Sequence, residues 1–210
     1  SNVSIFQQSE NVQLFGNVMA LHKQCETEYL WINSDEDFFC PVGLNALTSV
    51  LEEDTPAFVS GGVLFPGKKV YRSNSGAIDS SEIRSAANYG SAVIYRNEEV
   101  LKAFQFLSEN RRIELVWLYP MFATALLCFL ANKPEASQSL PHILAEKKSQ
   151  VETEIADTQG EKYYHIESRI RQLRSVPILA ERLRAFLDSN VAKRIDRWEK
   201  SERLQTFSRL

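Results

Sequence analysis

The chain has 210 residues, of which 44% are hydrophobic and 24% are charged, as expected for one substantial domain or one domain with a helical appendage. The formal net charge of −3 argues against a general nucleic-acid binder, because a DNA-binding domain usually carries a strong basic excess. The three cysteines and three histidines lack metal-ligand spacing, which disfavours a zinc site and favours free thiols in a reducing compartment.

The start of the chain has the alternating pattern of an α/β protein. Residues 3–7 alternate as a short strand does, and apolar positions then recur at helical spacing from Val12 to Cys25, with Asn11 able to cap that helix. Tyr29–Ile32 is a continuous apolar run, typical of a strand covered on both faces. This β-α-β order predicts a parallel pair of strands with a right-handed crossover.

The alternation continues after this strand. Pro41 can occupy the first turn of a helix through Leu51, and 57–65 is typical of a strand in which Gly61-Gly62 allows a close approach to the backbone. The pattern then predicts, in order, an exposed hairpin or loop over 68–81, a strand over 91–95 and a helix over 98–108.

The longest apolar run extends from Leu115 to Ala131, and its length lies at the lower edge of what crosses a bilayer. We interpret it as a helix over 113–131 that is buried in the fold, with one face turned to the core: Leu115, Leu118, Phe122, Leu126 and Phe129. The chain opens without a signal-peptide pattern, so we expect a cytoplasmic protein. Arg111-Arg112 allows a peripheral contact with the inner face of the membrane, and a membrane-associated protein using 115–131 is a further alternative.

The composition changes at Ser137, where charged residues begin to dominate. We expect a core over 1–136 and a helical region over 137–210, with helices near 141–157, 161–174, 177–189 and 191–208 and breaks at Pro177 and Asn190. The apolar side chains between 173 and 187 need a partner surface, either the core or a second copy of the chain. The last segment, 191–210, is the part that we least expect to dock.

An acidic triplet, Asp35-Glu36-Asp37, follows the strand at Tyr29–Ile32. In open α/β sheets ligands lie outside the carboxyl ends of the strands, and carboxylates there can hold Mg²⁺ or Mn²⁺. Alternate side chains of an extended turn point to the same side, so Asp35 and Asp37 are the candidate metal ligands. The alternative is a solvated acidic turn that caps the next helix.

The residues from Tyr29 to Asp37 resemble the segment that runs into the Asp-x-Asp motif of GT-A, family-2-like glycosyltransferases. Asn11 and Phe15-Gly16-Asn17 upstream are similar to the Asn-rich helix start of this family, and Tyr119-Pro120 recurs in its bacterial members. The resemblance covers about residues 3–134. It implies a GT-A-like, Rossmann-like fold with a mostly parallel sheet, a nucleotide-sugar donor, a hydroxyl acceptor, and Mn²⁺ or Mg²⁺ as cofactor.

The resemblance also implies site residues. The segment from Tyr89 to Arg96 is similar to the strand that follows the family's acceptor loop, which makes Tyr89, Gly90 and Ser91 substrate-binding candidates together with Asp35. The Glu-Asp pair that usually marks the catalytic base is missing. Glu114 is the candidate base, because partial burial at the start of the apolar helix would raise its pKa, and its alternative role is that of a helix-start carboxylate.

The chain departs from the family before the acidic triplet. Only 34 residues precede Asp35, so we expect an N-terminally shortened member in which part of the nucleotide site is missing. The main alternative to a glycosyltransferase is therefore a catalytically silent relative that acts as an interaction or assembly protein. Such a protein would use the helical region 137–210, and a homo-oligomer formed through that region is possible under either reading.

Overall fold

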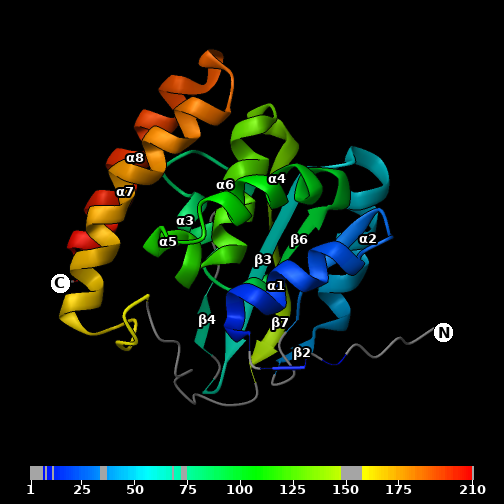
Figure 1. The fold of residues 1–210 in the computed structure, drawn as a ribbon. Coiled ribbons are helices and arrows are strands. Elements are labelled where there is room, and N and C mark those ends of the chain that lie inside the picture. The colour runs from blue at the N-terminus through cyan, green and yellow to red at the C-terminus, as the bar shows by residue number, and fades with distance from the viewer. Residues whose placement is uncertain are drawn as a thin grey trace.

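The computed structural model describes residues 7, 9–10, 12–33, 37–67, 69–71, 75–147 and 158–209, which form a mixed α/β fold (Figure 1). The described strands form one sheet in the order β1-β6-β3-β7-β2, with β4 paired to β3 and β5 to β7. Their bounds are β1 Tyr29–Trp31, β2 Asp37–Phe39, β3 Phe58–Phe65, β4 Lys69–Tyr71, β5 Gly76–Ala77, β6 Val93–Arg96 and β7 Ser137–Lys147. The strand predicted over 3–7, and with it the predicted parallel pair, lies almost wholly outside the described residues.

The prediction of a mostly parallel sheet is wrong for the described strands. Only β3 and β7 pair in parallel, whereas β1–β6, β6–β3 and β2–β7 pair antiparallel. Parallel neighbours need a long crossover, usually a helix. Among the described residues between β3 and β6, the one α-helix is the single turn α3, Ile83–Ala86, and β6 returns antiparallel. The longer helices after β6 then bring β7 back parallel to β3.

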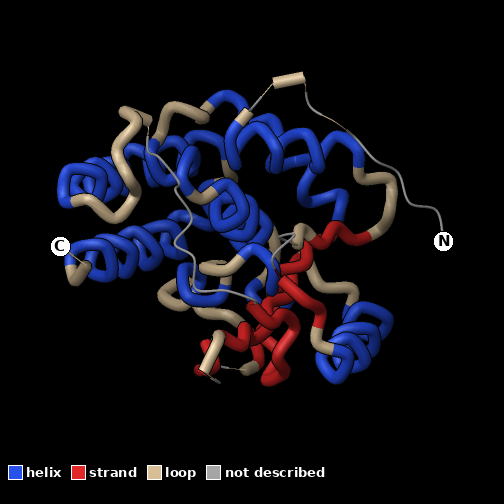
Figure 2. The backbone as a smooth tube through the Cα atoms, turned by 90° about the horizontal axis from the view of Figure 1, so that it is seen from below, coloured by secondary structure: helices blue, strands red, loops and turns tan. Residues whose placement is uncertain are grey.

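Helices cover both faces of the sheet (Figure 2). The longer helices are α1 Gln13–Gln24, α2 Pro41–Asp54, α4 Asn97–Glu109, α5 Glu114–Leu118, α6 Pro120–Ala131, α7 Ile166–Phe186 and α8 Ala192–Phe207. Leu47 of α2 packs with Val59, Val63 and Leu144 in a small cluster on one face. The main core lies on the other face, where residues of α1 and of α4 to α8 pack together.

The apolar stretch over 113–131 forms two helices, α5 and α6, instead of the one that we predicted. Tyr119 separates them at φ −134° and ψ 60°, as expected for a residue before a proline, which the ring of Pro120 excludes from the helical region. The five side chains predicted to face the core are at most 2% exposed, which confirms the burial prediction. None of the described helices has the length and apolarity needed to cross a membrane.

The helix predicted near 141–157 is wrong over 141–147, where β7 lies in the sheet between β3 and β2, and the rest of that range lies outside the described residues. Residues 137–147 therefore belong to the sheet and not to the helical region. The strand was not recognised in the sequence because β7 contains Pro141 and pairs with β3 through two register shifts, which interrupt strand alternation. Gly61 of β3 does allow a close approach, because a Cβ there would lie 2.3 Å from Cγ of Leu144.

The predicted break at Pro177 is also wrong, because α7 continues through this residue. Val176 and Leu179 beside the proline are 0% and 1% exposed. Burying two such side chains contributes about 3–6 kcal/mol, which offsets the roughly 3 kcal/mol cost of a proline inside a helix. The break near Asn190 is confirmed, since a 3₁₀ turn over Ser189–Val191 separates α7 from α8.

The two C-terminal helices pack against each other and against the α/β part (Figure 1). Leu183 of α7 and Ile195 and Trp198 of α8 are fully buried in the same core as Phe122 of α6. The partner surface of the helical region is thus the α/β part of the chain. The expectation that 191–210 docks least is wrong, because α8 supplies Trp198, a large side chain at 0% exposure.

Candidate functional site

Five strand ends meet at one edge of the sheet. Because β6 is antiparallel to both β1 and β3, and β3 is parallel to β7, the carboxyl ends of β1, β3 and β7 lie at the same edge. The amino end of β6 and the amino end of β2 lie there too, since β2 is antiparallel to β7. This is the edge at which α/β proteins usually bind their ligands.

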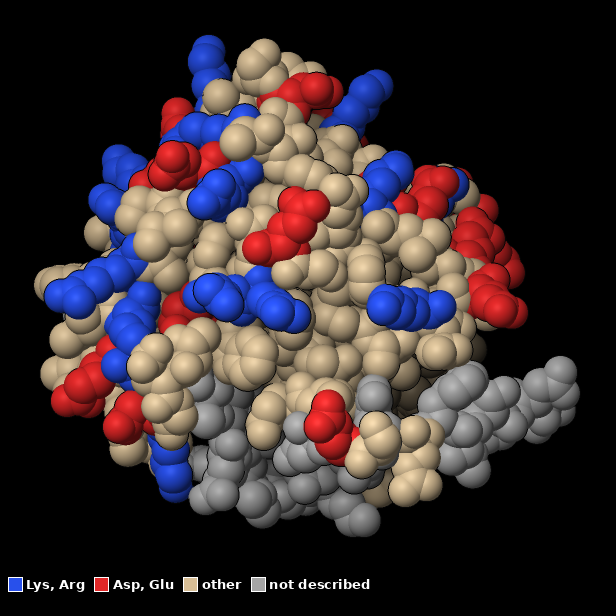
Figure 3. Space-filling model, viewed as in Figure 1, with Lys and Arg blue, Asp and Glu red and all other residues tan. Residues whose placement is uncertain are grey.

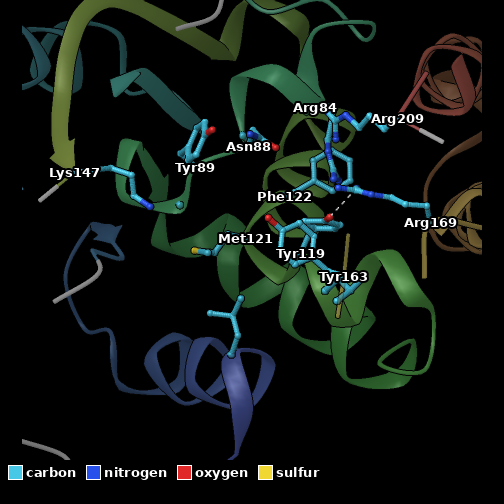
Figure 4. Close-up of a pocket in the computed structure, with 14 residues that line it drawn as sticks. Arg84, Asn88, Tyr89, Tyr119, Met121, Phe122, Lys147, Tyr163, Arg169 and Arg209 are labelled. Carbon is cyan, nitrogen blue, oxygen red and sulfur yellow. Dashed lines mark hydrogen bonds between the residues drawn. The ribbon is translucent and has the colours of Figure 1, made fainter. Parts of the chain in front are cut away.

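A cavity of about 280 Å³ opens beside this edge (Figure 4). Its lining comes from distant parts of the chain: Leu14 of α1, Arg84 and Ala87–Gly90 around α3, Leu118, Tyr119, Met121 and Phe122 around α6, Lys147 at the end of β7, and Tyr163, Arg169 and Arg209 of the C-terminal region. The α/β part and the helical region therefore build the cavity together.

Two of the three predicted substrate residues near β6 line the cavity. The Tyr89 ring contacts those of Phe65 and Tyr71, whose centroids are 5.1 and 4.8 Å from its own, and burial raises the pKa of its hydroxyl. Gly90 begins the 3₁₀ turn before β6, and a Cβ there would lie 2.0 Å from the Met121 sulfur, so the glycine makes room for that side chain.

Ser91, the third of these candidates, does not line the cavity. It is 8% exposed, and its carbonyl oxygen accepts a hydrogen bond of 2.9 Å from Nε1 of Trp31. This bond fixes the turn before β6 to the end of β1. The role of Ser91 as a substrate ligand therefore stays a prediction, whereas its contact with Trp31 indicates a positioning role.

The acidic turn lies at the same edge as the cavity. Asp35 and Glu36 are outside the described residues, but Asp37 begins β2 and is the register partner of Lys147, which lines the cavity. The carbonyl oxygen of Asp37 accepts a hydrogen bond of 3.0 Å from Asn33. Its side chain is 9% exposed, and Oδ1 is buried with no hydrogen-bond partner among the described residues.

A buried carboxylate oxygen with no donor is unusual, because buried polar atoms normally have a partner. A divalent cation held by Asp37 and Asp35 would satisfy this atom, and carboxylates are the hard oxygen ligands that Mn²⁺ and Mg²⁺ prefer. Within the described ranges, no three His, Cys, Asp or Glu side chains gather as a metal site, and Asp35 falls outside those ranges. Asp37 is thus the one proposed metal ligand that the structure describes, its unpartnered oxygen is of the kind that such an ion prefers, and binding of the ion stays a prediction.

Glu114, the candidate base, begins α5 and is 5% exposed. Its carboxylate accepts hydrogen bonds from the backbone nitrogen and the hydroxyl of Thr158, at 3.2 and 2.5 Å. Glu114 is not part of the cavity lining, although Leu118 and Tyr119 at the other end of α5 are. The carboxylate anchors the segment that leads into α7, and its role as a base stays a prediction.

Sequence reasoning missed the cations of the cavity, Arg84, Lys147, Arg169 and Arg209. Successive members of this set are 22 to 63 positions apart in the chain, so no local pattern joins them. The surface charge gives no sign of them either, because Lys and Arg are intermixed with Asp and Glu over the face shown in Figure 3. The one sign in the sequence was Arg84, a charged residue that α3 carries between Ile83 and Ser85.

A scan of the chain against models of protein families finds no match, and a search of curated proteins finds none with significant similarity. The resemblance to GT-A glycosyltransferases therefore stays a prediction that rests on the residues of the chain itself.

Proposed function

We propose that the protein is a GT-A-like glycosyltransferase that moves a sugar from a nucleotide-sugar donor to a hydroxyl acceptor with the help of a divalent metal. The observation that carries this proposal is the buried Oδ1 of Asp37, which has no partner among the described residues at the sheet edge where the acidic turn follows β1. The cavity beside Lys147 supports it, because Tyr89 and Gly90 of the predicted acceptor region line that cavity.

Asp35 and Asp37 would hold Mn²⁺ or Mg²⁺ together with the diphosphate of the donor. When bound, the ion supplies positive charge that neutralises the leaving diphosphate. The ammonium group of Lys147, across the β2–β7 pair from Asp37, would add a second positive charge on the cavity side of the same diphosphate.

In the reaction, the acceptor oxygen forms a bond to the anomeric carbon of the sugar, and the bond from that carbon to the diphosphate oxygen breaks. The diphosphate leaves with the bonding electron pair, and the hydroxyl proton passes to a general base, for which Glu114 is the predicted residue. Tyr89 would orient the acceptor, because an aromatic side chain offers an apolar face for a sugar ring and a hydroxyl for its polar groups.

The test is calorimetry of the full chain with Mn²⁺ and a nucleoside diphosphate. We expect Asp37→Asn to weaken the Mn²⁺-dependent binding of the nucleotide at least tenfold, because the amide has nearly the same shape and no charge. The control is Asp188→Asn, an exposed carboxylate in the turn between α7 and α8, which should bind like the parent.

Equal binding by the Asp37 variant and the parent would contradict the proposed metal site. The same titration separates the enzyme from a catalytically silent assembly protein, which would bind neither Mn²⁺ nor the nucleotide.

A further inference from the structure

Three arginines gather at the end of the cavity that lies away from the acidic turn. In Figure 4, Arg84, Arg169 and Arg209 lie together beside Tyr119, whereas Lys147 and Tyr89 lie on the opposite side. Among the described residues that line the cavity there is no Asp or Glu. Three guanidinium groups around one hollow repel each other unless an anion lies between them.

Arg84 is the most constrained of the three. It is 2% exposed, and its guanidinium carbon lies 3.9 Å from the centroid of the Tyr119 ring and 4.8 Å from that of Phe122. Among the described residues its one close carboxylate is that of Glu202, with Nη1 3.7 Å from Oε1, beyond hydrogen-bond distance. Nε and Nη1 are buried with no hydrogen-bond partner within the described ranges. A buried guanidinium with vacant donors is suited to a planar or phosphate-like anion.

Arg169 is held in place by its neighbours. Its Nη1 donates to Oε1 of Gln172 at 3.1 Å and to the hydroxyl of Tyr119 at 3.5 Å, a contact marked by the dashed line in Figure 4. Its guanidinium also lies 5.3 Å from the centroid of the Tyr163 ring. These contacts use one nitrogen and one face of the group, which leaves its other donors for a ligand.

The helical region thus contributes directly to the cavity. Arg169 lies on α7 and Arg209 directly follows α8, and both line the cavity together with Arg84 of the α/β part. Glu202 offsets one of the three positive charges, so the arginine end keeps a net positive charge. At the Lys147 end, by contrast, one cation stands opposite one carboxylate, that of its register partner Asp37.

We infer that the arginine end binds an anionic group, a phosphate or a carboxylate, that the acceptor carries at a distance from its reacting hydroxyl. This inference rests on the proposed function, which gives the Asp37 and Lys147 end to the donor diphosphate. The acceptor would then lie along the cavity, with its anion between Arg84, Arg169 and Arg209 and its hydroxyl toward Tyr89. The volume of about 280 Å³ is that of a small ligand site and accommodates a sugar with one such group.

The test compares three probes of similar size, glucose 1-phosphate, glucuronate and glucose, in NMR titrations of the full chain at low salt. We expect the two anions to bind at least tenfold more tightly than glucose. The two anionic arms show whether phosphate or carboxylate is preferred. Arg169→Ala should weaken the binding of the better anion at least tenfold, and Arg182→Ala, which removes an exposed arginine of the same helix, should change it less than twofold.

Arg84→Lys gives a second readout, because it keeps the charge and loses the two-pronged donor geometry. We expect it to weaken anion binding while circular dichroism shows an intact fold. Glucose binding as tightly as its phosphate, or unchanged anion binding in Arg169→Ala, would overturn the inference. Asp37→Asn should leave anion binding intact, so a failure of the donor site is distinguishable from a failure of the arginine site.

Discussion

His22 of α1 is 0% exposed, and neither ring nitrogen has a hydrogen-bond partner among the described residues. Burial lowers the pKa of this imidazole from 6.5 to about 4, because the charged form loses its hydration. The folded protein therefore keeps His22 neutral at a pH where the unfolded chain protonates it. The stability that this provides is present above pH 6.5 and is lost as the pH falls toward 4.

We expect the free energy of unfolding to fall by about 2 kcal/mol between pH 7 and pH 5 through His22 alone, as a difference of one pKa unit corresponds to about 1.4 kcal/mol. Urea unfolding at the two pH values measures this change. His22→Leu should remove it, whereas His165→Gln, at an exposed histidine, should retain it. An equal loss of stability in His22→Leu and the parent would assign the acid sensitivity to other groups.

Among single residues, the sequence predicted the site residues that belong to a local pattern and missed those that do not. Asp37 and Tyr89 each stand next to a strand end, and a strand end is visible in the sequence as the limit of an apolar run. The arginine end of the cavity depends on α8 packing beside α3 and on α7 packing beside α5. No spacing rule connects Arg84 to Arg169, so these residues could be found only in the structure.

Helix α2 packs so closely on the sheet that one of its residues must be glycine. A Cβ on Gly43 would lie 2.0 Å from the carbonyl oxygen of Ile143 in β7. A backbone atom of a strand that is paired on both sides cannot move aside as a side chain can. Gly43 therefore fixes how near α2 lies to β7, and β7 ends at Lys147 in the candidate site.

We expect Gly43→Ala to destabilise the protein by about 1–3 kcal/mol, the usual cost of overpacking. The change would otherwise favour the helix by up to about 1 kcal/mol, so a net loss reports the clash with β7. Thermal unfolding measures it. Asn45→Ala, on an exposed position of the same helix, is the matched control and should be neutral or slightly stabilising. A stabilised Gly43→Ala variant would show that α2 can move away from the sheet.

Elements with a clear local signal were predicted, and the pairing of the strands was not. Helices α2 and α4 follow from Pro41 and from the apolar spacing after Asn97, and β3 follows from its apolar run. The direction of β6 and the strand character of β7 depend on partners tens of residues away. Pro141 and the register shifts in β7 further weaken the alternation from which a strand is recognised.

The described chain behaves as one packed unit, and not as an α/β core with an appendage. The main hydrophobic core contains side chains from α1, α4, α5 and α6 together with Val176, Leu183 and Trp198 of the helical region. The ion pair between Arg84 and Glu202 joins the same two parts, with both side chains nearly inaccessible. The cavity spans this junction, so the stability of the fold and the shape of the candidate site depend on the same contacts.

We therefore expect a chain that ends after Val191, and so lacks α8, to lose cooperative thermal unfolding. Ile195 and Trp198 are fully buried, and each contributes about 1.5–3 kcal/mol. Their removal also exposes the core residues that they cover, and the combined loss approaches the roughly 5–15 kcal/mol that stabilises a whole domain. Circular dichroism during heating measures the transition.

Leu204→Ala in the full chain is the control, because this α8 side chain is 62% exposed and should change the melting temperature by no more than a few degrees. A shortened chain that melts cooperatively near the parent temperature would show that α8 only rests on a core that is stable without it.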